Sequence, residues 1–311
     1  MIAVWLVGAI IVTGAAVRVS GSGLGCPDWP ACQRGSLVPT SGWHGWIESL
    51  NRYFTGAVSV AIAVCVLGSL ARSPRRRDLT RLSLGLVGGV MAQAILGGIT
   101  VKTKVHPAAV AGHYLLSIVL LINAIVLVER AKRNDDVVRR FVGSDRVLAA
   151  IVGMPVAVIL LTGTGVTGSG PHSGDEKAHR FSWLPSSAAK VHSVSVWLFL
   201  TAVVGVTWWV ARHGERSRFE DRITFVLVAI VGQGMLGYIQ YFSGVPAVLA
   251  LAHVAGSVLV ASAATLLVLN FGSSPPSTAA GGLFAGDDHD EIGDGDGANL
   301  LLPVVRRSHD M

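Results

Sequence analysis

The sequence contains few charged residues for its length. Only 14% of its 311 residues are Asp, Glu, Lys or Arg, whereas 51% are hydrophobic. Soluble domains contain about 25% charged residues, and the mean hydropathy of this chain is +0.57. The shortage of charge therefore excludes an ordinary soluble domain and predicts a protein embedded in a lipid bilayer.

Eight stretches lack charge over a length sufficient to cross a membrane. A hydrocarbon core of about 30 Å requires about 20 predominantly apolar residues of helix. The first stretch also lacks the basic segment and the cleavage site of a signal peptide, so we count it as a span. The predicted spans are residues 2–17, 53–71, 82–101, 107–128, 147–166, 188–211, 223–242 and 246–270.

The Lys and Arg residues are distributed unequally between the loops that join these spans. Loops 72–81, 129–146 and 212–222 together carry 15 of them, whereas the opposite side carries 8. Because basic loops stay in the cytoplasm, we expect a multi-pass protein of the cell (plasma) membrane with both termini inside. No binding module accompanies these scattered basic residues, which excludes nucleic acid as a partner and leaves membrane lipid.

Cysteine is scarce, and its three copies are unevenly placed. Cys26 and Cys32 share the segment GCPDWPAC in the first outward loop, and Cys65 lies alone in the second span, where we expect inert packing. The outer face of a bacterial membrane is oxidising and permits a Cys26–Cys32 disulfide. Spacing alone leaves open whether such a pair is a structural clip or a redox-active site.

The apolar spans contain an internal repeat. Residues 93–113 (QAILGGITVKTKVHPAAVAGH) and 233–253 (QGMLGYIQYFSGVPAVLALAH) share Gln, Leu, Gly, Ile and His at the same offsets. The segments TGAAVRVSGSG and TGTGVTGSG match more weakly, and the spans that follow them align Asn51 with His192. The repeat predicts an all-α polytopic membrane protein whose eight transmembrane helices form two pseudo-symmetric four-helix bundles.

The same repeat divides the chain into domains. We expect an N-terminal four-helix bundle at residues 1–128, a cytoplasmic linker at 129–146 and a C-terminal four-helix bundle at 147–270. Residues 271–311 are rich in Gly, Ser, Pro and acidic side chains, which predicts a disordered cytoplasmic tail. The tail lacks a Glu at the closing position of a calcium-binding loop.

Three of the ten histidines, His113, His192 and His253, fall within spans at positions related by the repeat. An unpaired polar group in hydrocarbon is unfavourable by about 2–7 kcal/mol. For one such histidine an interhelical hydrogen bond is the simpler interpretation, but three at repeat-related positions favour metal ligation. His192 and His253 lie on two helices of one bundle, where they can hold a haem iron on both axial sides. Zinc is disfavoured because it requires three or four ligands.

The first bundle offers only one such imidazole. His113 occupies the position of His253, whereas Asn51 stands in the position of His192. A carboxamide is a weak ligand for haem iron, so a haem held by His113 would be five-coordinate. Glu48 lies one turn before Asn51 on the same helix face, and it is also spaced to form a simple ion pair with Arg52.

These residues together resemble the haem A synthase (COX15/CtaA) family. The resemblance rests on GAAVRVSGSGLGCPDWPAC, the element from Glu48 to Arg52, the GGITV segment and the three histidines, and it covers residues 1 to about 270. It implies an oxidoreductase that converts a ring methyl of haem O to a formyl group, which gives haem A for cytochrome c oxidase.

The resemblance also implies the ligands and partners. The C-terminal bundle would bind a haem b cofactor through His192 and His253, and the N-terminal bundle would present the substrate haem to His113 and Glu48. The Cys26 and Cys32 pair matches the outer-loop cysteines of the family. Expected partners are haem O synthase (protohaem farnesyltransferase), the cytochrome c oxidase assembly machinery, an unidentified electron donor and a second copy in a homo-oligomer.

One position departs from the family, whose members commonly carry His where this chain has Asn51. Either His113 alone holds the substrate iron, or His44 or His106 supplies a second ligand, or the chain belongs to a subgroup with different first-half chemistry. We assign catalysis to Glu48, for proton transfer, and to Asn51, as a hydrogen-bonding partner of water or an oxygen species. Arg52 and His113 are assigned to substrate haem binding.

Three further basic residues lie on the outward side, and two other functions compete with the synthase. Arg18, Lys104 and Lys190 are candidates for the haem propionates, although snorkelling to lipid headgroups explains Lys190 better. The alternative function is a non-catalytic bis-His haem b electron carrier, which gives no role to Glu48 or the cysteine pair. A transporter is disfavoured because the repeats are parallel and no span is broken in mid-membrane.

Overall fold

The computed structural model describes residues 1–33, 35–39, 42–133, 141, 143–176, 178–214 and 216–272. Over these residues the chain is helical, and its single β-bridge joins Gln33 and Ser36. The helices are α1 (Ile2–Val19), α2 (Trp43–Ala71), α3 (Arg77–Lys102), α4 (Pro107–Ala131), α5 (Ser144–Ser169), α6 (Pro185–Arg212), α7 (Arg216–Phe242) and α8 (Ala247–Phe271). The predicted tail beyond residue 272 and linker residues 134–140 and 142 lie outside the described residues.

All eight described helices contain a segment long and apolar enough to cross a membrane, which confirms the predicted spans. The side chains on their outer faces are apolar, as in α2, where Val60, Val64 and Leu67 are 66%, 62% and 65% exposed. Positions spaced by three and four residues form one helix face, and in water such a face would be unstable. The chain is therefore a multi-pass membrane protein.

The largest difference from the predicted spans is the start of α2, which begins at Trp43 and not near residue 53. Its 29 residues extend about 44 Å at 1.5 Å per residue, which exceeds a hydrocarbon core of about 30 Å. The first three turns carry the polar residues Glu48, Asn51 and Arg52, and so escaped a search for apolar length. The opening of α2 is thus helical, and the helix is longer than a hydrocarbon core requires.

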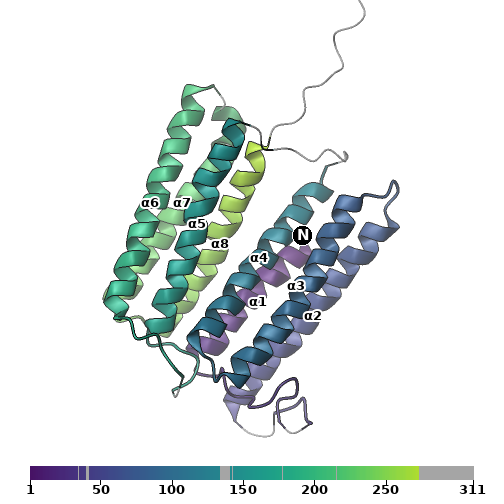
Figure 1. The fold of residues 1–311 in the computed structure, drawn as a ribbon, viewed down its shortest axis with the longest axis vertical. Coiled ribbons are helices and arrows are strands. Elements are labelled where there is room, and N and C mark those ends of the chain that lie inside the picture. Colours follow the sequence, from purple (N-terminus) through teal and green to yellow (C-terminus); the bar gives the residue numbers. More distant parts are fainter. Residues whose placement is uncertain are drawn as a thin grey trace, which may run out of the picture. The chain divides into compact units, whose positions relative to one another are not determined.

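The helices of each half form a closed ring of neighbours, which confirms the two pseudo-symmetric four-helix bundles (Figure 1). In the first bundle α1 contacts α2, α2 contacts α3, α3 contacts α4, and α4 returns to α1; α5 to α8 repeat this order. The bundles meet where α8 contacts α1 and α4, and where α4 contacts α5. This contact zone of α1, α4 and α8 is called the seam below.

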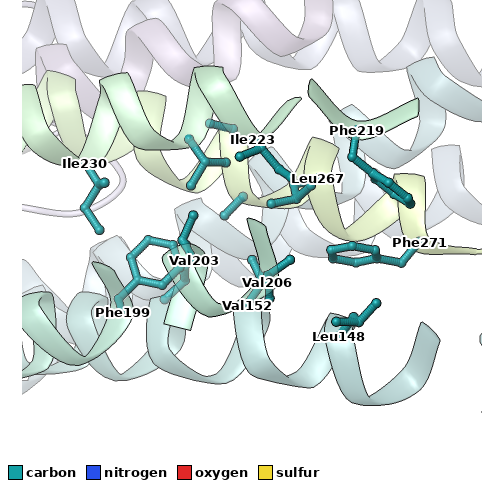
Figure 2. Packing of buried hydrophobic residues seen from close by; sticks show 14 of the residues in the cluster. Leu148, Val152, Phe199, Val203, Val206, Phe219, Ile223, Ile230, Leu267 and Phe271 are labelled. Atoms are coloured by element: carbon teal, nitrogen blue, oxygen red, sulfur yellow. The ribbon is translucent and has the colours of Figure 1, made fainter. Parts of the chain in front are cut away.

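Apolar side chains fill the part of each bundle that lies away from the α1–α2 and α5–α6 loops. In the second bundle Phe199, Val203 and Val206 of α6 lie together with Ile223 of α7 and Leu267 of α8 (Figure 2). A second cluster packs α1 to α4 and includes side chains of α8. The predicted histidine sites lie nearer the opposite end of the bundles, which we call the disulfide-loop end.

The α1–α2 and α5–α6 loops lie at that same end (Figure 1) and contact each other. The backbone N–H of Gly23 donates to the carbonyl of Gly174 at 2.8 Å. A Cβ atom on Gly23 would lie 2.9 Å from the Gly174 oxygen, and Gly174 has φ +101°, so this close approach requires glycine at both positions. Loops from the two halves thus join over the ends of their bundles.

Candidate functional site

His192 of α6 and His253 of α8 face each other inside the second bundle. Their ring centroids are 6.4 Å apart, and the ring planes are inclined by 73°. With metal–imidazole bonds of about 2.0 Å, two imidazoles on opposite sides of one ion have ring centroids about 6 Å apart. The described residues contain no group of three or more His, Cys, Asp or Glu side chains that could hold a metal ion. The pair therefore suits a porphyrin iron, which brings its other ligands with it, better than zinc.

The two rings differ in how their nitrogens are satisfied. His192 Nδ1 lies 3.0 Å from the Thr162 hydroxyl of α5. That hydroxyl also donates to the Val158 carbonyl at 2.9 Å and lies 3.0 Å from the Ser195 hydroxyl, so it ties the His192 ring to α5. His253 Nδ1 is buried and has no hydrogen-bond partner among the described residues. An interhelical hydrogen bond thus accounts for one ring and not for the other.

The first bundle repeats the threonine contact with a different partner. The Thr13 hydroxyl of α1 lies 2.8 Å from Asn51 Oδ1 of α2, just as Thr162 contacts His192 across α5 and α6. The matching threonines support the alignment of Asn51 with His192, which the sequence indicated only weakly. Neither threonine was predicted as a site residue, although both open the TG segments of the repeat.

The exchange of His for Asn leaves space in the first bundle. A Cβ atom on Gly163 would lie 3.2 Å from His192 Cε1, whereas a Cβ atom on Gly14, its counterpart, would meet nothing within 4 Å. Asn51 is shorter than an imidazole and does not reach the Cβ position of Gly14. The contact that His192 makes with the Gly163 position is therefore missing in the first bundle.

His113 and His253 occupy equivalent environments. Gln93 Nε2 donates to the His113 carbonyl at 3.0 Å, and Gln233 Nε2 donates to the His253 carbonyl at 2.6 Å. Like His253, His113 has a buried Nδ1 without a hydrogen-bond partner among the described residues. A buried polar group left unpaired costs about 1–3 kcal/mol. Both rings thus keep unsatisfied polar atoms that a ligand can satisfy.

Glu48 is directed toward the disulfide loop. It is 7% exposed, and its Oε1 lies 2.5 Å from Arg52 Nη2, so the predicted i, i+4 ion pair is present. Its other oxygen accepts a hydrogen bond from the backbone N–H of Cys26 at 2.8 Å. The carboxylate therefore joins α2 to the loop, a contact that sequence spacing did not indicate.

Arg52 holds the same loop from its other side. The permitted disulfide between Cys26 and Cys32 is present, and the Arg52 guanidinium lies 5.2 Å from the centroid of the Trp29 ring. Arg52 also donates to the loop carbonyls of Asp28 (3.1 Å), Ala31 (3.2 Å), Pro30 (3.4 Å) and Cys26 (3.5 Å). We call Glu48 and Arg52, with their contacts to residues 26–32, the loop clamp.

The comparisons with known proteins assign this arrangement to a family. The model of the COX15-CtaA family, described as cytochrome oxidase assembly protein, matches residues 1–265. The chain belongs to the COX15-CtaA family. Its relatives include proteins named heme A synthase from Listeria monocytogenes, 25% identical over 78% of this chain and 85% of that protein, and from Shewanella oneidensis, 28% identical over 49% and 48%.

The remaining candidates of this COX15-CtaA chain lie in or near the loops. The His44 ring is engaged by Ser22, with Nδ1 and Oγ 2.9 Å apart. His106 caps α4 by accepting from the Ala108 N–H at 3.3 Å, and its ring centroid lies 6.1 Å from that of His179. Lys104 and Lys190 are exposed. The structure thus brings the in-span histidines and the loop clamp to the disulfide-loop end of the bundles.

The loop clamp makes a prediction about the disulfide of this COX15-CtaA protein. Replacing Arg52 with Gln removes charged donors from several loop carbonyls, and a hydrogen bond to a charged group is worth about 1.5–3 kcal/mol. We expect the Cys26–Cys32 disulfide to be reduced about tenfold faster or more, because the loop opens more often. The rate is measured by thiol labelling in dilute reductant, with Lys104→Gln as the control. An unchanged rate would refute the clamp.

Proposed function

We propose that this protein is a haem A synthase, which oxidises a ring methyl of haem O to a formyl group. Family membership over residues 1–265 and the names of its relatives support a role in haem A biosynthesis. The observation that carries the specific reaction is the pair of related sites: two facing imidazoles in one bundle and, in the other, a carboxamide, Asn51, that takes the place of one imidazole and keeps its threonine contact.

The second bundle, residues 147–270, is proposed to hold a haem b cofactor. His192 and His253 would hold its iron, and Thr162 would fix the orientation of the His192 ring. When bound, a bis-imidazole haem b supplies one-electron transfer. The apolar cluster that includes Phe199 and Leu267 closes the bundle beyond the site and excludes water from it.

The first bundle, residues 1–128, is proposed to bind the substrate haem O. His113 would hold the substrate iron from α4, and Asn51, which lacks the contact that His192 makes with the Gly163 position, would leave the other iron face open. Thr13 engages the Asn51 carbonyl oxygen, so the amide N–H groups are free to orient water or an oxidant. With dioxygen as the oxidant, each hydroxylation of the methyl would take two electrons from the donor and two protons and release one water. Two hydroxylations would give a gem-diol, and its loss of water would leave the formyl group.

Glu48 and Arg52 are proposed to serve the substrate site from its loop side. Glu48 lies one turn from Asn51 and exchanges protons with the reacting oxygen, while Arg52 holds the carboxylate in place. Arg52 was assigned to substrate binding from the sequence. Its contacts with the loop carbonyls suggest that it acts on the substrate through the position of residues 26–32.

The setting of the protein is part of this proposal. We infer that it lies in the plasma membrane with both termini in the cytoplasm, because the three basic loops share one side. Haem O synthase would supply the substrate, the product would enter cytochrome c oxidase, and an unidentified donor would reduce the second-bundle haem. A homo-oligomer in the membrane is also proposed.

A non-catalytic haem b electron carrier is the second candidate. The facing imidazoles of His192 and His253 favour it as much as they favour a synthase. An electron carrier gives no role to the equivalent site of Asn51 and His113, although this site keeps the threonine and glutamine contacts of the repeat. The first bundle thus repeats the contacts of the second, and only the synthase gives this second site a role.

Deletion of the gene tests the reaction. A synthase predicts that haem O accumulates and haem A disappears from the cells, and that the wild-type gene reverses both changes. The haems are extracted and separated by reverse-phase chromatography, with haem b as the internal reference. An electron carrier predicts unchanged haem A, and that result would exclude the proposed reaction.

A further inference from the structure

Arg18, in the last turn of α1, is a partly buried cation that has few protein partners. Its Nη1 donates to the carbonyl of His172, in the α5–α6 loop, at 2.7 Å. No Asp or Glu carboxylate of the described residues forms an ion pair with it. A guanidinium carries five N–H donors. In Arg18 only Nη1 donates a hydrogen bond to an acceptor among the described residues.

The α5–α6 loop keeps the Arg18 side chain from extending to the lipid headgroups. Arginines near helix ends generally extend along the helix and place the charge among the lipid headgroups. The stem of Arg18 is covered by the α5–α6 loop, because a Cβ atom on Gly174 would lie 3.5 Å from Arg18 Cγ, and Gly174 is itself bonded to Gly23. A charge enclosed without a counter-ion is strongly unfavourable, so an anion is expected beside it.

The neighbours of Arg18 place it between the two histidine sites. It lies close enough to Tyr114 for an electrostatic interaction, and Tyr114 directly follows His113. The Tyr114 hydroxyl is 2.7 Å from the Ser257 hydroxyl, four residues after His253. Arg18 thus stands at the loop end of the seam of α1, α4 and α8, within reach of both bundles.

The repeat supplies only one such cation. Arg18 follows Thr13 by five residues, and the residue that follows Thr162 by five is Thr167, which is uncharged. Five helical residues rise about 7.5 Å, so Arg18 stands between the level of Asn51 and the disulfide-loop end. A porphyrin centred near Asn51 and His113, with its carboxylate edge toward the loops, would present an anion there.

We infer that Arg18 binds a propionate carboxylate of the porphyrin in the first bundle. The forked guanidinium matches a carboxylate in geometry and charge, and the helix that carries it also carries Thr13 of the same site. This inference rests on the proposed function, because it takes the ligand of the first bundle to be a porphyrin. The second-bundle porphyrin is the other source of the same carboxylate chemistry.

Esterified porphyrin provides the test. Purified protein with its resident haem is titrated in detergent with iron protoporphyrin IX and with its dimethyl ester, which lacks both negative charges. We expect the wild type to bind the free acid about tenfold more tightly or more. Arg18→Gln should lose this preference, Arg18→Lys should keep most of it, and Lys102→Gln, which removes an exposed cation at the end of α3, should keep all of it.

The variants also show which bundle holds the porphyrin whose carboxylate binds Arg18. They further distinguish a failure of the Arg18 site from a failure of the proposed function. Binding that disappears in His113→Ala belongs to the first bundle, whereas a loss of resident haem from Arg18→Gln would place the carboxylate in the second bundle. A preference retained in Arg18→Gln, or equal changes for acid and ester, would overturn the site and leave the proposed function standing. A wild-type protein that binds no porphyrin would overturn the proposed function itself.

Discussion

Replacing His192 with Ala is expected to abolish the low-spin haem signal of the purified protein. With imidazoles of His192 and His253 on both axial sides, the proposed haem b is six-coordinate, and loss of one imidazole leaves a five-coordinate, high-spin iron. Absorption and paramagnetic-resonance spectra of equal amounts of the two proteins measure the effect.

Two further variants make this experiment specific. Thr162→Val keeps the imidazole and removes the hydroxyl that fixes it, so we expect haem affinity to fall about 10–100-fold while saturated protein stays low-spin. Asn51→Ala changes the equivalent position of the first bundle and should leave the signal intact. A low-spin signal that survives in His192→Ala would exclude the ligand assignment.

The elements of the fold could be predicted because membrane insertion depends on a simple property. Spans were found from apolar length alone, and the repeat supplied their grouping into bundles. The start of α2 could not be found in this way, because its first turns are stabilised by contacts with a loop that lies about 20 residues earlier. Glu48 and Arg52 bind that loop, and such contacts leave no periodic pattern in the sequence.

The site was predictable in its rare residue types and not in its common ones. An in-span histidine is expensive in hydrocarbon and therefore informative, which made His113, His192 and His253 visible. Threonine is common in transmembrane helices, where it usually bonds its own backbone, so the roles of Thr13 and Thr162 required the neighbouring helix. The direction of the Glu48 side chain likewise depended on a fold that brings residues 26–32 onto α2.

Replacing Asn51 with His is expected to build a second bis-imidazole site in the first bundle. Thr13 is already placed to bind the new ring as Thr162 binds His192, and no described side chain lies within 4 Å of a Cβ atom placed on Gly14. His113 would supply the opposite ligand. The double variant His192→Ala, Asn51→His should therefore regain the low-spin signal that His192→Ala lacks, when both are loaded with an excess of haem b.

The same substitution tests the open iron face that the proposed reaction requires. Relatives commonly carry His at this position, so a loss of activity is expected only if this chain belongs to a subgroup with different first-half chemistry. In that case haem A formation in cells carrying Asn51→His should fall about 100-fold or more, because the new imidazole occupies the iron face that the oxidant needs. Asn51→Gln, which keeps the carboxamide, should fall much less. A new low-spin signal with unchanged haem A formation would show that two imidazoles also support the reaction, and the role of Asn51 would then be to tune the substrate iron. A double variant that stays high-spin would instead refute the equivalence of Asn51 and His192 on which both expectations depend.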